Sequence, residues 1–437
     1  MIALHYNEAL DWIHSIARFG MNQGLERIEA LLDLLGNPHR SCKYLHIGGT
    51  NGKGSTAAFV AAMLEEAGYR VGLYTSPYLV QFTNRMAING RDIPRKRLVE
   101  LVKKVKPLVE KIAADPVLGQ PTEFEVVTAL AFCYFAEESP DIVVLEVGLG
   151  GRLDATNVVQ PLVTAIATIS LEHTQVLGNT VEEIAREKAG IIKNGAPVVT
   201  EAGGGALPVL EAVCKEKQVP LYQLGKHFHA QIETQDVGGQ VFHYRGLSRE
   251  YHALFIPLLG DYQVNNVALA IAAVELLCDN GFSISEATLR AGLEKTRWPG
   301  RLEVLRRSPL VVVDGAHNLE AFQGLGRGVR QTFAYGKLIL VLGILSDKAA
   351  ENILAEILPL ADRLIITKPN SPRAANPEVL QKIVSGMMPE LPCEISEEIP
   401  AAVDMALKQA GDEDLVLIAG SLYLVSDARQ YLKSCLV

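Results

Sequence analysis

"HIGGTNGKGST", residues 46–56, lies between an apolar run and a run with helical periodicity. A glycine-rich segment between a strand and a helix is typical of a phosphate-binding loop, because glycine lets backbone N–H groups face an anion. The stretch departs from the common G-x-x-x-x-G-K-[ST] pattern: its first two pattern glycines are one residue too close, and Gly54 separates Lys53 from Ser55. It is therefore either a glycine turn between two elements or a different kind of nucleotide loop.

We expect a nucleotide loop, because both flanks have the right character and a lysine and a serine are in place. The predicted helix starts at Ser55 and adds its positive end to the anion site. Lys53 can reach the β- and γ-phosphate oxygens of ATP, and the Ser55 hydroxyl can coordinate Mg²⁺. The residues expected to contact the nucleotide here are Thr50, Asn51, Gly52, Lys53, Gly54 and Ser55.

The totals of the chain exclude several classes. Its 437 residues predict two or three domains, and its apolar runs are broken well before the length of a membrane span. The first residues do not resemble a signal peptide. A net charge of −9 argues against nucleic-acid or anionic membrane partners. Six scattered cysteines without a C-x-x-C pair argue against a disulfide scaffold or a zinc site. We expect a cytoplasmic protein, a monomer, that acts on small molecules.

Strand-like and helical runs alternate along the first part of the chain, which predicts an α/β fold with a mostly parallel sheet. The segment 238–257 has short alternating runs and turn glycines, and predicts a small antiparallel section. The segment 262–281 is a predicted amphipathic helix closed by Gly281. The other predicted strands are 43–48, 70–75, 141–147 and 163–169, and the other predicted helices are 55–67, 95–113, 122–138 and 180–190.

A second α/β series begins after Trp298-Pro299-Gly300, which interrupts the periodicity. We therefore expect an ATP-binding domain over 1–297, of P-loop type with helices on both faces of its sheet, and a smaller Rossmann-like α/β domain over 298–437. The predicted strands of the second series are 309–315, 338–344, 363–368 and 414–420.

Polar side chains follow the predicted strands of the first domain, and ligands of an open parallel sheet bind beyond its carboxyl ends. Ser76 follows the second strand, Glu146 ends the third, and Glu172-His173 follow the fourth. Singly, each has an ordinary explanation: a turn, a solvent-facing acid, a structural histidine. Together they predict a metal- and phosphate-binding edge. The glycines after Glu146, in GLGGRLDATN, are expected to let a ligand approach.

The second domain shows the same arrangement at its own predicted strand ends. Asp314 and His317 follow the first strand, Asp347-Lys348 follow the next, and Ser421 follows the last. We expect a second polar edge that faces the first across a cleft able to hold ATP and an acceptor.

At these residues the chain resembles the folylpolyglutamate synthase/dihydrofolate synthase family, relatives of the Mur ligases. GTNGKGS (49–55) together with EVGLGGRLDATN (146–157) is the most specific part of the resemblance. The other matching motifs are GLERIEALL (24–32), LGNPH (35–39), TSP (75–77), FEVVTALAF (124–132), EHTQVLG (172–178), EKAGI (187–191), PGRLE (299–303), DGAHN (314–318), SDK (346–348) and GSLYLV (420–425).

The resemblance implies an ATP-dependent ligase that adds L-glutamate to folate or dihydropteroate through an acyl phosphate. It implies two Mg²⁺ ions, one at Ser55 and one at Ser76, Glu146 and His173. It also matches Lys188 to a carbamylated lysine, whereas the residues alone predict an exposed helix lysine there.

Further roles follow position by position from the resemblance. The nucleotide side would include Asn266, Arg301, Asp314, Asp347 and Lys348, and the glutamate side would include His317 and Ser421. The pterin side would comprise Gly24, Leu25, Phe124, Glu125, Asp154, Ala155 and Asn157, with Arg152 in the same loop. The residues expected to act in catalysis are Lys53, Lys188, Asp314 and His317.

The chain departs from the family pattern at Tyr78, where histidine is common, and at Asn84, which precedes Arg85 where glutamate is usual. Glu172 and Tyr262 also differ from the residues that are common there. Two alternatives remain open at this stage: a Mur-type ligase acting on another acceptor carboxylate, and a non-catalytic nucleotide-binding module. The motifs GLER, TSP and GRLDATN favour the folate branch over the first, and the polar set of the second domain argues against the other.

Overall fold

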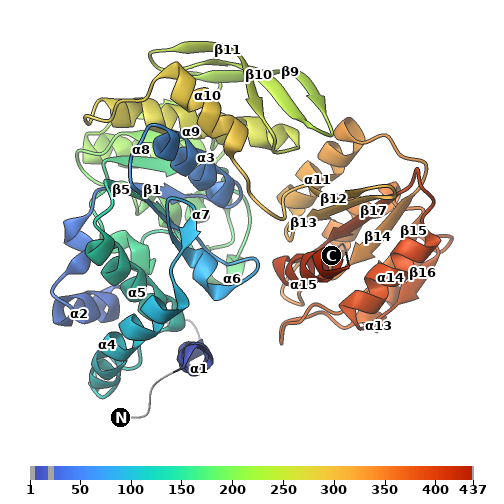
Figure 1. The fold of residues 1–437 in the computed structure, drawn as a ribbon, viewed down its shortest axis with the longest axis horizontal. Helices are drawn as coiled ribbons and strands as arrows, with labels where there is room; N and C mark the ends of the chain where they lie inside the picture. The colour runs from blue at the N-terminus through green and yellow to red at the C-terminus, as the bar shows by residue number, and fades with distance from the viewer. Residues whose placement is uncertain (1–4, 18–23, 436–437) are drawn as a thin grey trace. The chain divides into compact units, whose positions relative to one another are not determined.

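The computed structural model describes residues 5–17 and 24–435, and the chain divides into two compact units. The first comprises the residues up to Ala230 together with His243–Leu254 and Asn265–Lys295, and the second comprises Gln231–Phe242, Phe255–Val264 and the residues from Thr296 on. Each unit has a parallel-dominated sheet with helices on its faces (Figure 1). The predicted α/β fold class is therefore confirmed.

The first unit is built on an eight-stranded sheet in the order β4-β3-β2-β5-β1-β6-β7-β8. The six strands from β2 to β8 in that order are parallel, and β3 and β4 are antiparallel additions at one edge. In sequence order the strands are β1 (Tyr44–Gly48), β2 (Val71–Tyr74), β3 (Met86–Ile88), β4 (Arg91–Asp92), β5 (Ile142–Glu146), β6 (Val163–Ile166), β7 (Val198–Thr200) and β8 (Leu221–Gln223).

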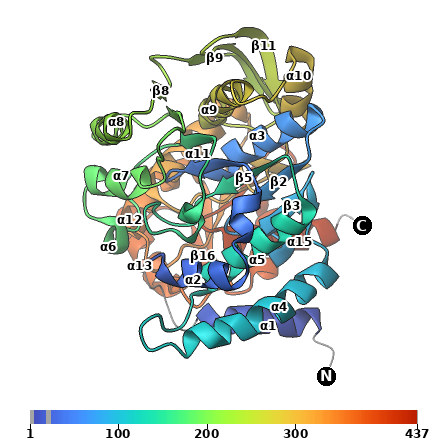
Figure 2. The same ribbon diagram turned by 90° about the vertical axis from the view of Figure 1, so that its left-hand side faces the viewer.

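Helices cover both faces of this sheet (Figure 2). A large core on one face joins strands β1, β2 and β5 to α1 (Tyr6–Ile16), α2 (Glu26–Leu34), α4 (Arg95–Ala113) and α5 (Glu123–Glu138). The other helices of this unit include α3 (Lys53–Glu66), α6 (Thr174–Leu177), α7 (Val181–Ala189), α8 (Ala206–Lys217) and α10 (Glu286–Lys295). Helix α9 (Asp261–Cys278) corresponds to the helix predicted over 262–281, and the residues from 265 on belong to this unit. The prediction that it is amphipathic was wrong, because residues 266–277 are all buried.

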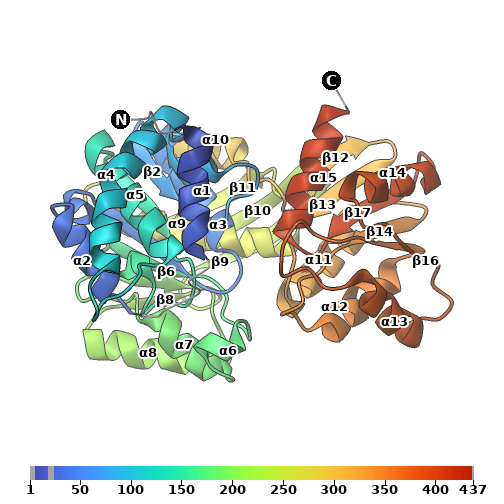
Figure 3. The same cartoon turned by 90° about the horizontal axis from the view of Figure 1, so that it is seen from below.

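The second unit is built on a six-stranded sheet in the order β12-β13-β17-β14-β15-β16, parallel except for the β12–β13 pair. Its strands are β12 (Glu303–Arg307), β13 (Leu310–Asp314), β14 (Leu338–Leu342), β15 (Arg363–Ile366), β16 (Cys393–Ile395) and β17 (Leu415–Ala419). Figure 3 shows α14 (Ile399–Gln409) and α15 (Leu422–Ser434) on one face and α11 (Leu319–Thr332), α12 (Ala350–Ile357) and α13 (Pro377–Met387) on the other.

A small third sheet has the order β11-β10-β9, from strands β9 (His229–Asp236), β10 (Gly239–Arg245) and β11 (Glu250–Ile256). The predicted section 238–257 forms β10 and β11, and the pattern missed β9. Strands β3, β4, β7 and β8 were also not predicted, because two or three residues are too few for a periodicity. Among the described helices, none is long and apolar enough to cross a bilayer.

Candidate active site

The glycine loop joins β1 to α3, and its backbone conformation requires glycine at two points. Gly49 has a φ of +135° and Gly52 a φ of +89°. A Cβ on Gly52 would lie 2.2 Å from the side-chain oxygen of Asn266, a residue of α9. Helix α3 begins at Lys53, two residues before the predicted start, because left-handed Gly52 is the residue that caps it. The glycine loop therefore leads directly into the first turn of α3. The backbone N–H groups of a first turn have no hydrogen-bond partner within their helix, so they are available to an anion bound at the loop.

The loop is held by the segment that follows β6. The Thr50 N–H donates to the Thr168 carbonyl at 2.6 Å, and the Asn51 N–H donates to the Thr168 hydroxyl at 3.3 Å. The Thr50 hydroxyl accepts from the Ser170 N–H at 3.1 Å. The Lys53 ammonium lies 3.1 Å from the Thr50 carbonyl. Apart from this one contact of Lys53, the loop is held by Thr168 and Ser170.

Lys188 lies beneath this loop and is buried, with 4% of its surface exposed. Its Nζ donates to the Gly49 carbonyl at 2.7 Å. Burial, together with the nearby Lys53 charge, lowers the pKa of Lys188 to about 7, against the opposing charges of Glu172 and Asp154. The expectation of an exposed helix lysine was wrong. Lys188 stands four residues after buried Ile184, on the apolar stripe of α7, and that spacing could have revealed its burial.

The glycines of GLGGRLDATN allow close packing of two backbones. A Cβ on Gly151 would lie 2.7 Å from the Glu187 carbonyl oxygen, and a Cβ on Gly190 would lie 2.4 Å from the Arg152 Cα. The Arg152 N–H donates to the Glu187 carbonyl at 2.7 Å. The expectation that these glycines admit a ligand is therefore wrong for Gly151, which faces α7. The contact fixes the end of the helix that carries Lys188.

The predicted polar residues of the first unit follow neighbouring strands, since β2, β5, β1 and β6 are adjacent and parallel. The Ser76 N–H donates to the buried Glu146 carboxylate at 3.0 Å. The Ser76 hydroxyl is buried and has no hydrogen-bond partner among the described residues. His173 has a left-handed backbone and its ring lies 3.9 Å from the Glu172 carboxylate. Ser55 is buried in the first turn of α3.

Glu125 belongs to a buried ion pair that the sequence did not suggest. Its carboxylate lies 3.1 Å from the guanidinium of Arg27, which is 5% exposed. The same side chain accepts from the Thr122 N–H at 2.6 Å and closes a capping box at the start of α5. Arg27 stands in the GLERI motif, two residues after Leu25, so one contact joins the GLERI and FEVVTALAF motifs. Gly24 is buried with a φ of +145°, and Leu25 caps α2.

Asp154 organises the loop that follows Glu146. Its carboxylate accepts from the Leu149 N–H at 2.8 Å and from the Thr156 N–H at 3.0 Å and hydroxyl at 2.5 Å. Burial raises the pKa of Asp154 against these hydrogen bonds. The Thr156 hydroxyl in turn lies 2.9 Å from Nε2 of His46, in the centre of β1. The loop is thereby tied to the strand that leads into the glycine loop.

The remaining residues of the predicted pterin side have different environments. Phe124 packs on Gly148, where a Cβ would lie 2.4 Å from its ring. Ala155 is buried, and the Asn157 amide donates to the carbonyls of Arg152 at 2.9 Å and Gly190 at 3.1 Å. The Arg152 guanidinium is exposed and paired with Glu187 at 2.9 Å.

In the second unit, Asp314 ends β13 and each oxygen of its carboxylate accepts from one backbone donor. It accepts from the Leu302 N–H and the Ala316 N–H, both at 2.8 Å, and Tyr262 approaches at 3.5 Å. Burial raises the pKa of Asp314, and the Arg301 charge opposes this shift. Arg301 lies against Gly315, where a Cβ would meet its guanidinium at 2.3 Å.

Of the other predicted residues of this unit, His317 follows β13 itself, Ser421 follows its neighbour β17, and Asp347 and Lys348 follow β14, the strand beyond β17. Nδ1 of His317 lies 3.1 Å from the Gly315 carbonyl, and buried Ser421 caps α15 by accepting from the Leu424 N–H. Asp347 is paired at 2.7 Å with Arg373, a residue that the sequence did not suggest. Partial burial acts to raise the pKa of Asp347, but the pairing with Arg373 holds this pKa below its usual value. The Lys348 N–H donates to the Leu345 carbonyl.

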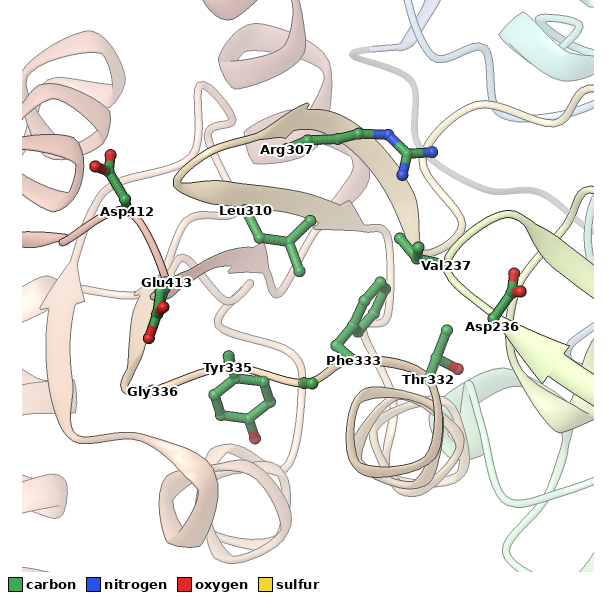
Figure 4. A pocket seen from close by; sticks show the side chains of 11 residues that line it. Asp236, Val237, Arg307, Leu310, Thr332, Phe333, Tyr335, Gly336, Asp412 and Glu413 are labelled. Atoms are coloured by element: carbon green, nitrogen blue, oxygen red, sulfur yellow. The ribbon is translucent and has the colours of Figure 1, made fainter.

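A separate pocket of about 660 Å³ lies in the second unit but away from these residues. Its lining includes Leu310 at the start of β13, Gly336 before β14 and Glu413 before β17 (Figure 4). It therefore lies at the end of the sheet opposite to Asp314 and Ser421, and we do not assign it to the active site.

The order of these parts is that of a Mur-type ligase. The Mur ligase middle domain matches residues 47–274, and the Mur ligase glutamate ligase domain matches residues 300–422. Dihydrofolate synthase/folylpolyglutamate synthase of Bacillus subtilis is 40% identical over 98% of this chain and 99% of its own length. Folylpolyglutamate synthase of Lacticaseibacillus casei is 35% identical over 98% and 99%. The chain therefore belongs to the dihydrofolate synthase/folylpolyglutamate synthase family.

Solved structures of this family have the same fold. Mycobacterium tuberculosis folylpolyglutamate synthase complexed with ADP aligns with a TM-score of 0.91 at 32% identity, over 98% of this chain and 99% of that one. E. coli FolC in complex with DHPP and ADP aligns with a TM-score of 0.88 at 28% identity, over 98% of each chain. The family resemblance drawn from the motifs is confirmed.

Proposed function

We propose that the protein is an ATP-dependent ligase that joins L-glutamate to the carboxyl group of a folate, and also of dihydropteroate. The observation that carries this proposal is the pair of lysines at the glycine loop, Lys53 at the start of α3 and buried Lys188 bonded to Gly49, in a chain of this family. Relatives with both activities in their names cover nearly the whole chain.

The reaction has two steps, because a carboxylate lacks a good leaving group. An oxygen of the acceptor carboxylate attacks the γ-phosphorus of ATP, the bond to ADP breaks, and an acyl phosphate forms. The glutamate amine then attacks the acyl carbon, phosphate leaves, and the amine loses a proton. Lys53 and the N–H groups of the first turn of α3 stabilise the charge on the transferred phosphoryl group. The nucleotide contacts would be completed by residues 50–55 and Asn266.

Asp314 and His317 are the two candidates for the group that takes the amine proton, and their contacts favour His317. The Asp314 carboxylate already accepts two backbone N–H bonds, which suits a role in holding the turn around Arg301. The Nδ1 contact of His317 with the Gly315 carbonyl favours a proton on Nδ1, so that Nε2 is the basic nitrogen. Ser421 would bind the incoming glutamate nearby, and Asp347 and Lys348 would lie beside the nucleotide.

The residues fit two Mg²⁺ ions. The buried Ser76 hydroxyl without a hydrogen-bond partner and the buried Glu146 carboxylate are oxygen donors of the kind that Mg²⁺ prefers. Ser55 would hold the first ion, and Ser76, Glu146, His173 and Lys188 the second. Within the described residues no three His, Cys, Asp or Glu side chains form a metal cluster, which is expected if serine hydroxyls and a modified lysine supply ligands. The ions supply charge neutralisation at the phosphates.

Carbamylation of Lys188 would convert its amine into a carboxylate. Only a neutral amine reacts with CO₂, and a pKa lowered to about 7 leaves a large neutral fraction at physiological pH. Protein prepared with ¹³C-bicarbonate should show one carbamate carbonyl resonance that is absent from Lys188→Met. The absence of that resonance in the parent protein would remove the modification from the mechanism.

The pterin end of the acceptor would lie at Phe124, Glu125, Asp154, Ala155 and Asn157, with Gly24, Leu25 and Arg152 near by. The observed contacts assign Asp154 and Glu125 a further structural task, because both hold backbone N–H groups. We expect their replacement to lower stability as well as acceptor binding.

The mechanism requires the strand ends of both domains, proposed as 1–297 and 298–437, to meet around ATP and the acceptor at some stage of turnover. Closure would exclude the water that hydrolyses an acyl phosphate. We also propose a monomer, which light scattering tests, and a cytoplasmic location, which the six free cysteines fit.

One assay tests the central proposal. Purified protein with Mg·ATP and labelled glutamate is offered dihydropteroate or tetrahydrofolate in parallel, and both labelled product and ADP are measured. If neither dihydropteroate nor tetrahydrofolate gave labelled product, the proposal would be overturned. The two rivals give other patterns: a ligase for another acceptor releases ADP only with that acceptor, and a binding module releases none that depends on glutamate.

A further inference from the structure

The loop between β2 and β3, residues 75–85, is closed at its base. The Thr75 N–H donates to the Arg85 carbonyl at 3.0 Å, and the adjoining Ser76 N–H is bound to Glu146. The short helical turn Phe82–Arg85 forms its far side. The loop therefore carries Ser76 of the proposed metal set at one end and Arg85 at the other. Ser76 is held at the base, by Glu146 and the Thr75–Arg85 contact, and not by the contacts within the turn.

Arg85 lies in an aromatic cluster within this loop. Its guanidinium carbon stands 5.2 Å from the ring centre of Tyr78 and 5.6 Å from that of Phe82, and the two rings are 5.9 Å apart. Its Nε is buried with no hydrogen-bond partner among the described residues. A cation held on ring faces beside unfilled donor capacity suits a ligand with a carboxylate and a flat aromatic part.

A single carboxylate oxygen, Oδ2 of Asp92 in β4, holds the turn. It accepts from the Asn84 amide at 2.6 Å, from the Gln81 amide at 3.0 Å and from the Thr83 hydroxyl at 3.3 Å. The Asn84 carbonyl oxygen accepts in the other direction, from the backbone N–H groups of Val80 at 3.2 Å and Gln81 at 2.9 Å. Asn84 is thus the link between Asp92 and the backbone of the turn.

This double role needs an amide. A carboxamide presents an acceptor to the Val80 and Gln81 N–H groups and a donor to Asp92 at once, whereas an ionised acid accepts only. Asn84 therefore has a partner, Asp92, that an acidic side chain at position 84 could not bind. Arg85 follows Asn84 directly, so the orientation of the turn sets the direction of its guanidinium.

We propose that Asn84 and Asp92 are positioning residues that orient Arg85 and Tyr78 for binding of the acceptor, and that they act on acceptor binding and not on ATP binding. The selectivity follows from the contacts, since the glycine loop is held separately, by Thr168 and Ser170. The inference rests on the proposed ligase function.

Asn84→Asp tests it by placing two carboxylates where a donor and an acceptor now meet. Loss of a charge-assisted hydrogen bond and the repulsion should raise the KM for dihydropteroate or tetrahydrofolate about tenfold or more, and the KM for ATP less than about twofold. The double variant Asn84→Asp/Asp92→Asn reverses the polarity of the pair, with residue 92 now the donor. It should recover part of the lost acceptor affinity, because the 84–92 hydrogen bond is restored while the Gln81 amide and the Thr83 hydroxyl lose the acceptor that Oδ2 of Asp92 gave them.

Asn352→Asp, the same change at an exposed residue of α12, is the matched control and should leave both KM values unchanged. Calorimetric binding of dihydropteroate gives the same comparison without turnover, and hydrogen exchange at Val80 and Gln81 reports the turn itself. An unchanged acceptor KM in Asn84→Asp, an equal rise in the KM for ATP, or no recovery in the double variant would overturn the inference. Absence of acceptor-dependent turnover in the parent enzyme would instead overturn the proposed function, and this inference with it.

Discussion

At the scale of single residues, Lys53 in the glycine loop and Lys188 beneath it are identical side chains that have different properties because their environments differ. Lys53 is partly exposed at the helix start, where its charge can meet phosphates. Lys188 is buried under the same loop, and its lowered pKa makes it a neutral amine for part of the physiological range. We therefore expect replacement of each to have a different signature.

Replacement of Lys53 by alanine should abolish most turnover and leave the fold intact. The loop is held by Thr50, Asn51 and Thr168, and Lys53 adds only one contact to the Thr50 carbonyl. Removing a charge aimed at the transferred phosphoryl group should lower kcat by a factor of about 10² to 10³. Glutamate-dependent ADP release measures the loss, and the melting temperature is the control. A fully active variant would refute the assignment of the loop.

At the scale of elements, the contact between α7 and the loop after β5 predicts a specific steric effect. Gly190 has ordinary helical φ, but a Cβ there would stand 2.4 Å from the Arg152 backbone. Gly190→Ala should lower the free energy of unfolding by about 1 to 3 kcal/mol and lower activity, because Lys188 shifts with the helix end. Gly203→Ala is the control, since nothing lies within 4 Å of its Cβ position. Equal stabilities of the two variants would contradict this prediction.

The link from β1 to the same loop predicts a pH effect. His46 is fully buried, and burial, with a smaller effect of the Lys193 charge, lowers its pKa to about 3. His46 therefore becomes protonated near pH 6.5 in the unfolded chain but stays neutral in the folded chain until the pH approaches 3. The stability that is present above pH 6.5 is for this reason lost as the pH falls toward 3. Between pH 7.5 and pH 5 the parent should lose about 2 kcal/mol more than His46→Gln in urea unfolding. Parallel losses in both proteins would count against it.

At the scale of the whole molecule, two compact units with separate cores predict stepwise unfolding. The core under α4 and α5 involves only the first unit, and the core around β14 and β17 only the second. We expect two calorimetric transitions, of which Mg·ADP raises the one that belongs to the first unit, with hydrogen exchange to assign it. A single transition seen by every probe would show that the units unfold together.

The fold was largely predictable because long strands and helices leave a period in the sequence. The helix over 95–113 has the predicted bounds, and the four main strands of each unit lie within their predicted ranges. Strands of two or three residues, such as β4 and β7, have no period to detect and were missed. The eight-residue strand β9 was missed as well, because none of its residues is fully buried. For the candidate site, the positions of Ser76, Glu146 and Asp314 at strand ends followed from the pattern, because parallel strands align their carboxyl ends at one edge.

Residues whose importance depends on a distant partner were not predictable in this way. Arg27 meets Glu125 across 98 positions of sequence, and Arg373 meets Asp347 across 26. No local pattern encodes such distances. The packing of α7 on Gly151 was not predicted for the same reason. The burial of Lys188 differs, since its place four residues after Ile184 on the apolar stripe of α7 was a local signal that the prediction overlooked.

The sequence by itself determined the layered α/β architecture, the nucleotide-type loop and the family, because periodicity and contiguous motifs are properties of neighbouring residues. Only the tertiary structure decided that Lys188 lies under that loop, that Gly151 and Gly190 serve backbone packing, and that Asn84 is hydrogen-bonded to Asp92. Desolvation, close approach and hydrogen-bond polarity arise between segments far apart in the chain, and they exist only once the chain has folded.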